Sequence, residues 1–224
     1  MIQSRSVNID VGQAHRVSGL WLAPEQGRAV YVFAHGAGAG MRHAFMEAAA
    51  QGLAERDIAS LRYQFPYMER GSRRPDAPPV AQATVRAAVA AAVQLAPSLP
   101  LFAGGKSFGG RMTSQAQAAA PMSGVRGLVF LGFPLHPAGE PSDARAAHLS
   151  DVLVPMLFLQ GTRDELADLP LLRPLVTRLG ERAMLHELTD ADHSFHVPAR
   201  SGRKDPEVLA EALDAFAAWI GSEG

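Results

Sequence analysis

The sequence of 224 residues contains no cysteine, which excludes disulfide bonds, thiolate nucleophiles and zinc sites built on thiolates. It also lacks a strong charge of either sign, since its formal net charge is −1 at pH 7. Domains that bind nucleic acids usually carry a broad basic surface. We therefore expect no nucleic-acid partner.

Apolar segments long enough for export or membrane insertion are also missing. The opening stretch, MIQSRSVNIDV, has no apolar core of signal-peptide length. Ala87 to Val93 is among the longest apolar runs and falls well short of the roughly 18 residues that a membrane-spanning helix needs. These absences predict a cytoplasmic protein with no membrane partner.

The composition is that of a globular domain. Hydrophobic residues make up 47% of the chain and charged residues 19%, which argues against a disordered or collagen-like protein. A chain of this length can bury a full hydrophobic core without covalent cross-links. Because no repeat of fixed period, low-complexity tract or linker divides it, we expect residues 1–224 to form a single domain. The sequence leaves the oligomeric state open.

The hydrophobic pattern alternates between strand-like and helix-like segments. Ala29–Ala34 is a short run rich in β-branched and aromatic residues, typical of a strand buried on both faces. Residues 43–57 carry apolar side chains at helical spacing instead. This alternation predicts an α/β fold, with an open, mostly parallel sheet and helices on both faces. Further strands are expected at 58–65, 99–103, 125–133, 154–160 and 183–188, further helices at 79–96, 108–120, 166–179 and 205–220, and an edge hairpin at 5–11 and 15–22.

Two stretches, residues 66–78 and 134–151, show no regular pattern, and we expect loops or short helices there. In open α/β sheets, ligands bind beyond the carboxyl ends of the strands. The two stretches are therefore expected to lie over the binding end of the sheet.

The most informative motif is Gly105-Lys106-Ser107-Phe108-Gly109, a G-x-S-x-G pattern between a predicted strand and a predicted helix. A strand that turns directly into a helix holds the serine at a strained apex, and the flanking glycines remove Cβ atoms that would collide. The motif predicts a nucleophile at Ser107, although a glycine-rich turn without catalysis is the plainer alternative. A phosphate-binding P-loop would need a glycine five residues before Gly105, where the chain has Pro100, and is disfavoured.

A serine hydroxyl is a weak nucleophile unless a base accepts its proton, so a histidine and an orienting acid should follow later strands. In folds with this turn, the chain order is serine, acid, histidine. Asp164 follows the strand predicted at 154–160, and His193 follows the strand predicted at 183–188. We therefore predict Asp164 as the acid and His193 as the base.

Neighbouring residues leave alternatives open. Glu165 or Asp168 could replace the predicted acid, and His196 could replace the predicted base. The spacing of His193 and His196 lacks the helix and the third ligand of a catalytic zinc site, so we expect no metal. The remaining histidines outside the loop that follows Ala34 are interpreted as surface or packing residues: His15, His43, His136, His148 and His186.

Acyl transfer also needs hydrogen-bond donors for the negative charge that develops on the substrate carbonyl. The backbone N–H of Phe108, directly after the predicted nucleophile, is one expected donor. The loop His35–Gly40 follows the strand predicted at Ala29–Ala34, and its small residues allow close approach of the main chain. We predict that Ala37 in this loop supplies the second N–H; the alternative is a flexible turn before a helix.

With these motifs in place, the sequence resembles the α/β-hydrolase superfamily over essentially its whole length. The segments HGAGAGMRH, GKSFGGR and DADHSF are similar to those of the small group related to the testis-expressed 30 protein and to the third regulatory subunit of the histone-acetyltransferase NSL complex. The chain also resembles dienelactone-hydrolase-like enzymes, which have cysteine where Ser107 stands. The resemblance implies a three-layer fold with about eight strands, a serine nucleophile and ester or thioester substrates. The stretch 134–151 leaves no room for a separate lid domain.

Together these observations predict a serine hydrolase that cleaves small or medium carboxylic esters or thioesters through an acyl-enzyme on Ser107. Asp164 and His193 would activate the serine, and the N–H groups of Ala37 and Phe108 would hold the oxyanion. A small acyl substrate is the expected partner, and no metal or organic cofactor is expected. The alternatives are a binding or scaffold protein with this fold and little turnover, and a peptidase or acyltransferase with the same residues.

Lys106 and an aromatic segment near residue 65 each have two possible interpretations. Lys106 is one of only two lysines and stands beside the predicted nucleophile, where its stem could pack or its ammonium could form a salt bridge below the site. Phe65, Tyr67 and Met68 are either walls of a pocket or ordinary packing anchors.

Overall fold

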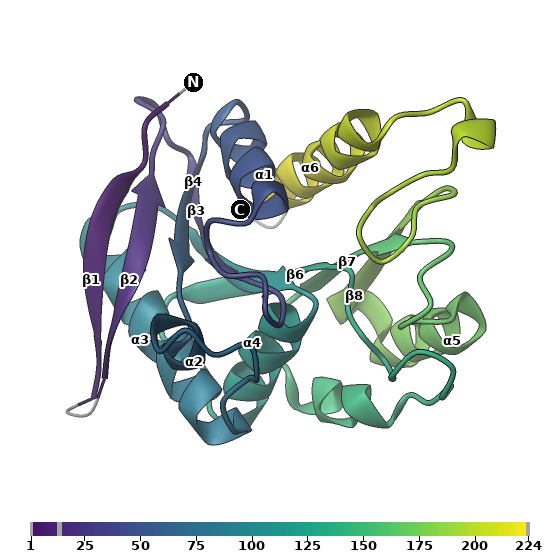
Figure 1. The fold of residues 1–224 in the computed structure, drawn as a ribbon, viewed down its shortest axis with the longest axis horizontal. Helices are drawn as coiled ribbons and strands as arrows, with labels where there is room; N and C mark the ends of the chain where they lie inside the picture. The colour runs from purple at the N-terminus through teal and green to yellow at the C-terminus, as the bar shows by residue number, and fades with distance from the viewer. Residues whose placement is uncertain (1, 13–14, 223–224) are drawn as a thin grey trace.

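The computed structural model describes residues 2–12 and 15–222 and contains one eight-stranded sheet (Figure 1). The strands are β1 (Arg5–Val11), β2 (His15–Leu22), β3 (Ala29–Ala34), β4 (Ile58–Tyr63), β5 (Leu101–Lys106), β6 (Val125–Leu131), β7 (Met156–Gly161) and β8 (Ala183–Leu188). Their spatial order is β1-β2-β4-β3-β5-β6-β7-β8. The β1–β2 and β2–β4 pairs are antiparallel, and every pair from β4 to β8 is parallel. The predicted mostly parallel sheet of about eight strands is confirmed.

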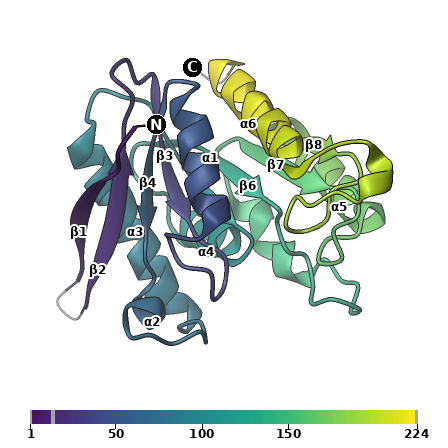
Figure 2. The same cartoon turned by 45° about the horizontal axis from the view of Figure 1, so that its top comes forward.

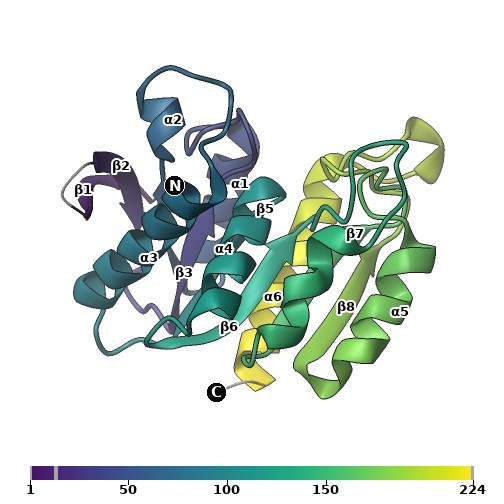
Figure 3. The same cartoon turned by 90° about the horizontal axis from the view of Figure 1, so that it is seen from below.

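Helices cover both faces of this sheet. They are α1 (Ala44–Ala54), α2 (Pro66–Glu69), α3 (Pro78–Leu95), α4 (Phe108–Ala119), α5 (Leu169–Leu179) and α6 (Asp205–Ser222), with short 3₁₀ helices η1 (Ala144–Asp151), η2 (Gly180–Arg182) and η3 (Ala199–Ser201). Helices α1 and α6 lie side by side on one face (Figure 2), and α3, α4 and α5 cover the other (Figure 3). In the described segments, no helix combines the length and the apolar character needed to cross a membrane.

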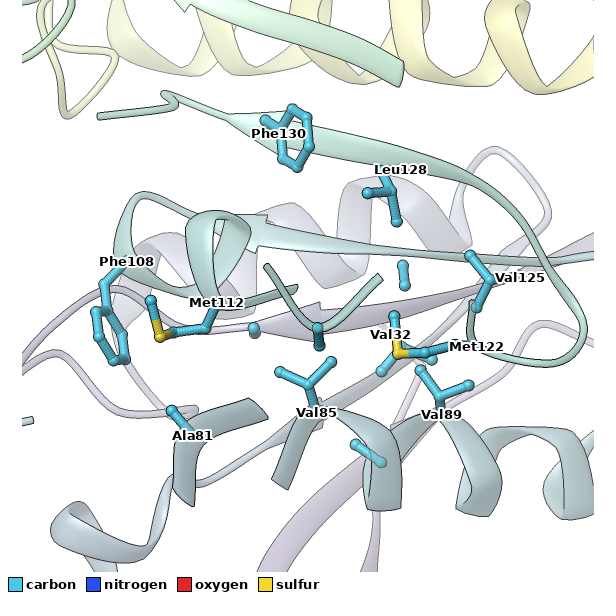
Figure 4. Close-up of a cluster of buried hydrophobic side chains, with 14 of the residues drawn as sticks. Val32, Ala81, Val85, Val89, Phe108, Met112, Met122, Val125, Leu128 and Phe130 are labelled. Atoms are coloured by element: carbon cyan, nitrogen blue, oxygen red, sulfur yellow. The ribbon is translucent and has the colours of Figure 1, made fainter. Parts of the chain in front are cut away.

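The alternating direction of side chains along the strands explains the apolar run of β3. Val30 and Val32 point into the core on the α3–α4 face, whereas Tyr31 and Phe33 point into the core on the α1–α6 face. Strand β3 is therefore covered on both sides, which accounts for its apolar sequence. Figure 4 shows part of the core on the α3–α4 face, where Val85 and Val89 point from α3 toward the sheet.

Successive strands are added on opposite sides of β3. The chain places β4 on one side of β3 and then returns to place β5 on the other side. The segment after β3 leads to α1 on one face, and the segment after β5 leads to α4 on the opposite face. Such a divergence opens a crevice at the carboxyl ends of the two strands, which is where α/β sheets bind ligands.

The bounds of several elements differ from those predicted. Strand β5 continues to Lys106 instead of ending at Ala103, because it runs directly into the turn at Ser107. Helix α5 begins at Leu169 instead of 166, because Asp164 organises a turn by accepting the backbone N–H of Leu166 at 2.8 Å. The stretch 66–78 contains α2, and the stretch 134–151 contains η1 and loops with no lid domain among its described residues.

The core on the α3–α4 face generates a stability prediction. Phe130 is 0% exposed and its ring centroid lies 4.9 Å from that of Phe158 and 5.1 Å from that of Phe133. Phe130→Ala is expected to lower the free energy of unfolding by about 3–5 kcal/mol, because it leaves a cavity among packed rings. The measurement is urea unfolding followed by circular dichroism.

The matched control is Leu153→Ala, since Leu153 is 72% exposed. This change is expected to alter the unfolding free energy by less than about 0.5 kcal/mol. Equal effects of the two substitutions would contradict the assignment of Phe130 to the core.

Candidate active site

Ser107 occupies the sharp turn between β5 and α4. Its backbone has φ 50° and ψ −114°, a conformation rarely adopted by a residue with a side chain. A Cβ on Gly105 would lie 2.4 Å from the carbonyl oxygen of Ala34, and one on Gly109 would lie 2.6 Å from the same atom. The two glycines therefore let β3, β5 and the first turn of α4 pack closely enough to form this turn, the steric role predicted for them.

Ser107, His193 and Asp164 form one chain of hydrogen bonds. The Ser107 hydroxyl lies 2.8 Å from Nε2 of His193, and Nδ1 of His193 lies 2.7 Å from Oδ2 of Asp164. A neutral imidazole fits this arrangement, since Nδ1–H donates to the carboxylate and Nε2 accepts from the hydroxyl. The three residues follow β5, β8 and β7, so the structure brings together the side chains that the sequence separates.

The alternative acid and base lie elsewhere. His196 is exposed and binds the carboxylate of Asp205 at 2.9 Å, and this hydrogen bond raises the pKa of His196. Glu165 is exposed, and a carboxylate oxygen of Asp168 lies 3.8 Å from Nε2 of His136. None of these side chains takes part in the hydrogen-bonded chain of Ser107.

Gln160 at the end of β7 fixes the carboxylate of Asp164. Its side-chain amide donates to Oδ2 of Asp164, while its Oε1 accepts the backbone N–H of Phe133 at 2.8 Å. Gln160 is fully buried, and the sequence analysis did not single it out. The available signal was a single amide side chain within an otherwise apolar buried strand, MLFLQG.

Ala37 and Phe108, the two predicted oxyanion donors, lie close to Ser107. Both residues line the same cleft as Ser107. Within residues 2–12 and 15–222, neither N–H donates a hydrogen bond to another protein group. Two free donors beside a serine hydroxyl can receive a substrate oxygen that carries negative charge.

The loop that carries Ala37 is held from below by aromatic side chains. The backbone N–H of Gly38 donates to the hydroxyl of Tyr67 at 3.0 Å, and that of Phe65 donates to Nε2 of His35 at 3.2 Å. Burial lowers the pKa of His35 to about 4, so its ring is neutral near pH 7 and can accept this bond. Phe65 and Tyr67 are buried packing anchors and do not line the clefts at Ser107.

Two clefts of about 350 Å³ each meet at Ser107 and share Ala37 and Leu166. The first, which we call the histidine-side cleft, is also lined by Gly36, Ala39, His43, Phe45, Met46, Lys106, His193 and Ser194. The second, the arginine-side cleft, is also lined by Pro75, Asp76, Pro78, Phe108, Arg111, Pro134 and Arg145. The irregular stretches 66–78 and 134–151 both contribute to the second cleft, which agrees with the position predicted for them.

Lys106 supports the segment that carries His193. Its ammonium donates to the carbonyl oxygen of His193 and lies 5.7 and 5.3 Å from the ring centroids of Phe45 and Phe195. Burial lowers the pKa of Lys106 to about 8. Among the described residues no carboxylate oxygen lies within 4 Å of the ammonium, so the suggested salt bridge is absent there and the ammonium binds a backbone carbonyl instead, while Cγ of Lys106 lies close to Gly36.

A larger depression of about 860 Å³ lies between β8 and α6, away from Ser107. Its histidine, His186, binds Glu211 at 3.1 Å, and its serine, Ser222, donates to the carbonyl of Trp219 in the same helix. The histidine and the serine thus bind separate partners and do not form a pair of nucleophile and base. The candidate active site is therefore the pair of clefts at Ser107.

Comparison with known proteins identifies the family. Residues 27–221 match the model of the alpha/beta hydrolase domain family. The chain belongs to this family. This result agrees with the resemblance found in the sequence and supports a role as a hydrolase.

Solved structures with the same fold cover nearly the whole chain. A dienelactone hydrolase from Anabaena variabilis has 20% identity and a TM-score of 0.77, with 99% of this chain and 98% of that chain covered. An α/β serine hydrolase without lid from Xanthomonas campestris has 22% identity and a TM-score of 0.71, with 96% and 95% covered. A cold-adapted esterase from an Arctic intertidal metagenomic library has 20% identity and a TM-score of 0.67, with 97% and 94% covered. At these identities the likeness establishes the shared fold.

The turn at Ser107 generates a prediction for its glycines. Gly105→Ala and Gly109→Ala are each expected to lower the free energy of unfolding by at least about 3 kcal/mol or to prevent folding, because the new Cβ collides with the Ala34 carbonyl. The control is Gly36→Ala, whose Cβ would meet its nearest neighbour at an ordinary 3.6 Å. Urea unfolding measures all three variants, and normal stability of Gly105→Ala would contradict the close packing.

The contact between Lys106 and the His193 carbonyl generates a second prediction. Lys106→Met is expected to speed amide hydrogen exchange across residues 189–197 by about tenfold or more, because it removes a charge-assisted hydrogen bond. Lys204→Met is the matched control, since Lys204 is the other lysine of the chain and is exposed. Exchange measured by mass spectrometry should change only in the first variant; unchanged exchange in Lys106→Met would contradict the supporting role.

Proposed function

We propose that this protein is a serine hydrolase that cleaves small or medium carboxylic esters or thioesters through an acyl-enzyme on Ser107. The observation that carries the proposal is the hydrogen-bonded chain of Ser107, His193 and Asp164, with separations of 2.8 and 2.7 Å. A hydroxyl, an imidazole and a buried carboxylate in this order are the groups needed to activate a serine. Membership of a hydrolase family supports the same reading.

In the first half of the reaction, Oγ of Ser107 attacks the substrate carbonyl while Nε2 of His193 accepts the hydroxyl proton. The imidazolium that forms is stabilised by the carboxylate of Asp164, which is 3% exposed and keeps its hydrogen bond to Nδ1–H. The oxyanion is held by the N–H groups of Ala37 and Phe108, each worth about 3 kcal/mol to such a transition state. The carbon–oxygen or carbon–sulfur bond then breaks, and His193 returns the proton to the leaving alcohol or thiol.

In the second half, water takes the place of the leaving group. His193 accepts a proton from this water as its oxygen attacks the acyl carbon, and the proton then passes to Oγ of Ser107 as the acid is released. Every proton is carried by His193. No step in this sequence requires a metal ion or an organic cofactor.

The position of His193 assigns the two parts of the substrate to the two clefts. The leaving group must lie within about 3 Å of Nε2 to receive its proton. His193 lines the histidine-side cleft, so the leaving alcohol or thiol is assigned to that cleft. The acyl group then extends past the oxyanion donors into the arginine-side cleft, where Phe108 forms part of the wall.

The dimensions of the site support small or medium substrates. Each cleft has a volume of about 350 Å³, near the lower end of the range for small-molecule sites. The structural neighbours include proteins described as a dienelactone hydrolase and an esterase, which favours ester chemistry over other reactions of the fold.

The test combines a fluorophosphonate probe with 4-nitrophenyl esters of increasing acyl length. Wild-type protein is expected to be labelled and to hydrolyse the shorter esters. Ser107→Ala should abolish labelling and lower kcat by about 10⁴-fold or more, because the nucleophile is lost. The matched control is Ser194→Ala, since Ser194 lines the same cleft without contacting the imidazole nitrogens; it should keep labelling.

Two results would contradict the proposal. Labelling and turnover that persist in Ser107→Ala would remove this residue from the mechanism. A folded wild-type protein that shows neither labelling nor turnover would favour a binding or scaffold role for the fold.

A further inference from the structure

Two arginines line the arginine-side cleft next to the nucleophile. Arg111 lies in the first turn of α4, where its backbone N–H donates to the carbonyl oxygen of Ser107 at 3.1 Å. Arg145 comes from η1 on the other side of the cleft. Elements that are separate in the sequence therefore place two guanidinium groups at one end of the site.

Neither guanidinium is neutralised by a carboxylate. In the described part of the chain, no carboxylate oxygen lies within 4 Å of Arg111 or Arg145, and Nε of Arg111 is buried without a hydrogen-bond partner. The only carboxylate among the described residues that line this cleft, Asp76, already accepts from Arg70 at 2.5 Å and from the backbone N–H of Tyr67 at 2.7 Å. The cleft thus carries two positive charges that no carboxylate of residues 2–12 and 15–222 neutralises through an ion pair.

The surroundings make this pair of charges electrostatically unfavourable. Burial and the nearby charge of Arg145 lower the pKa of Arg111, although a guanidinium stays protonated near neutral pH. Burial and the charge of Arg111 lower the pKa of neighbouring His148 to about 4, so this ring contributes no charge near pH 7. A bound anion between the two arginines would relieve their mutual repulsion.

The remaining walls of the cleft are apolar. Pro75, Pro78 and Pro134 line it together with Phe108, whose ring centroid lies 6.0 Å from Cζ of Arg111. Such walls suit a chain of methylene groups. The planar guanidinium groups of the two arginines present N–H donors whose geometry matches the two oxygens of a carboxylate.

We propose that the arginine-side cleft is a carboxylate-binding subsite, so that the preferred substrates are esters or thioesters whose acyl chain ends in a second, free carboxylate. The chemical class is the half-ester of a short dicarboxylic acid. This inference rests on the proposed function, because the acyl group is assigned to this cleft from the position of His193.

The kinetic test compares two esters that differ only in charge. One is 4-nitrobenzyl hydrogen glutarate, and the other is the corresponding 4-nitrobenzyl ester of glutaramic acid, in which a neutral primary amide replaces the carboxylate. The alkyl leaving group limits spontaneous cleavage by the free carboxylate. Release of 4-nitrobenzyl alcohol, measured by chromatography, is expected to show a kcat/KM about tenfold or more higher for the charged ester.

Arg111→Gln and Arg145→Gln are each expected to lower the ratio of kcat/KM for the charged ester to that for the neutral ester by about tenfold, since each removes a charge-assisted hydrogen bond. Arg145→Lys keeps the charge and should retain a higher ratio than Arg145→Gln. The control is Arg126→Gln, which removes the same charge from an exposed position at the amino end of β6, the opposite end of the sheet. Its ratio should equal that of the wild type.

The outcomes separate this inference from the function on which it rests. Equal hydrolysis of both esters by the wild type, with ratios unchanged in the arginine variants, overturns the carboxylate subsite and leaves the serine hydrolase intact. Loss of the preference in Arg126→Gln also overturns it, because the effect would then be one of net charge.

A binding measurement covers the case in which neither ester is turned over; probe labelling then decides separately whether Ser107 is a nucleophile. In the Ser107→Ala protein, titration calorimetry should show tighter binding of the hydrogen glutarate ester than of the neutral ester. Adding Arg145→Gln to this protein should remove the difference. Equal affinities in Ser107→Ala overturn the subsite.

Discussion

The site depends on how closely the main chain approaches the carbonyl oxygen of Ala34. Gly105 and Gly109 both pack against this atom, at distances that leave no room for a Cβ. Because of this contact, β5 can end and α4 can begin within one residue, with the Ser107 hydroxyl held at the outside of the turn. A looser approach would rotate the serine away from the imidazole and separate it from the backbone N–H groups of the preceding loop.

A second close approach places the histidine. A Cβ on Gly161 at the end of β7 would lie 2.3 Å from the carbonyl oxygen of Ala191 and 2.7 Å from that of Asp192. The segment that carries His193 can therefore lie directly over the strand that precedes Asp164. Both halves of the hydrogen-bonded chain are thus positioned by backbone contacts that only glycine permits.

The sequence was sufficient to predict the fold and to bring three candidate residues together, because both rest on local patterns. Strands covered on both faces are mostly apolar, and the turn at Ser107 requires glycines at fixed positions. The choice between His193 and His196 was harder, since both lie in one short loop. In the structure, His193 contacts Ser107, whereas His196 binds Asp205 at the start of α6.

Other features of the site could not be predicted because they depend on the directions of side chains in irregular segments. The pairing of Gln160 with Asp164 requires knowing that the amide points across the sheet edge. The convergence of Arg111 and Arg145 requires the path of residues 134–151, which has no periodic pattern to reveal it. Lys106 stands out in the sequence because it is one of only two lysines, but the sequence does not show that it binds the carbonyl of His193, 87 residues away.

The reactive groups and the residues that line the arginine-side cleft come from different kinds of segment, which has a consequence for how the protein can change. The reactive groups follow strand ends, whereas half of the residues that line the arginine-side cleft come from 66–78 and 134–151. Replacement of these two segments would therefore reshape selectivity while the chemistry stayed in place. Natural variation or protein engineering can therefore change which substrates are recognised by altering these two segments alone.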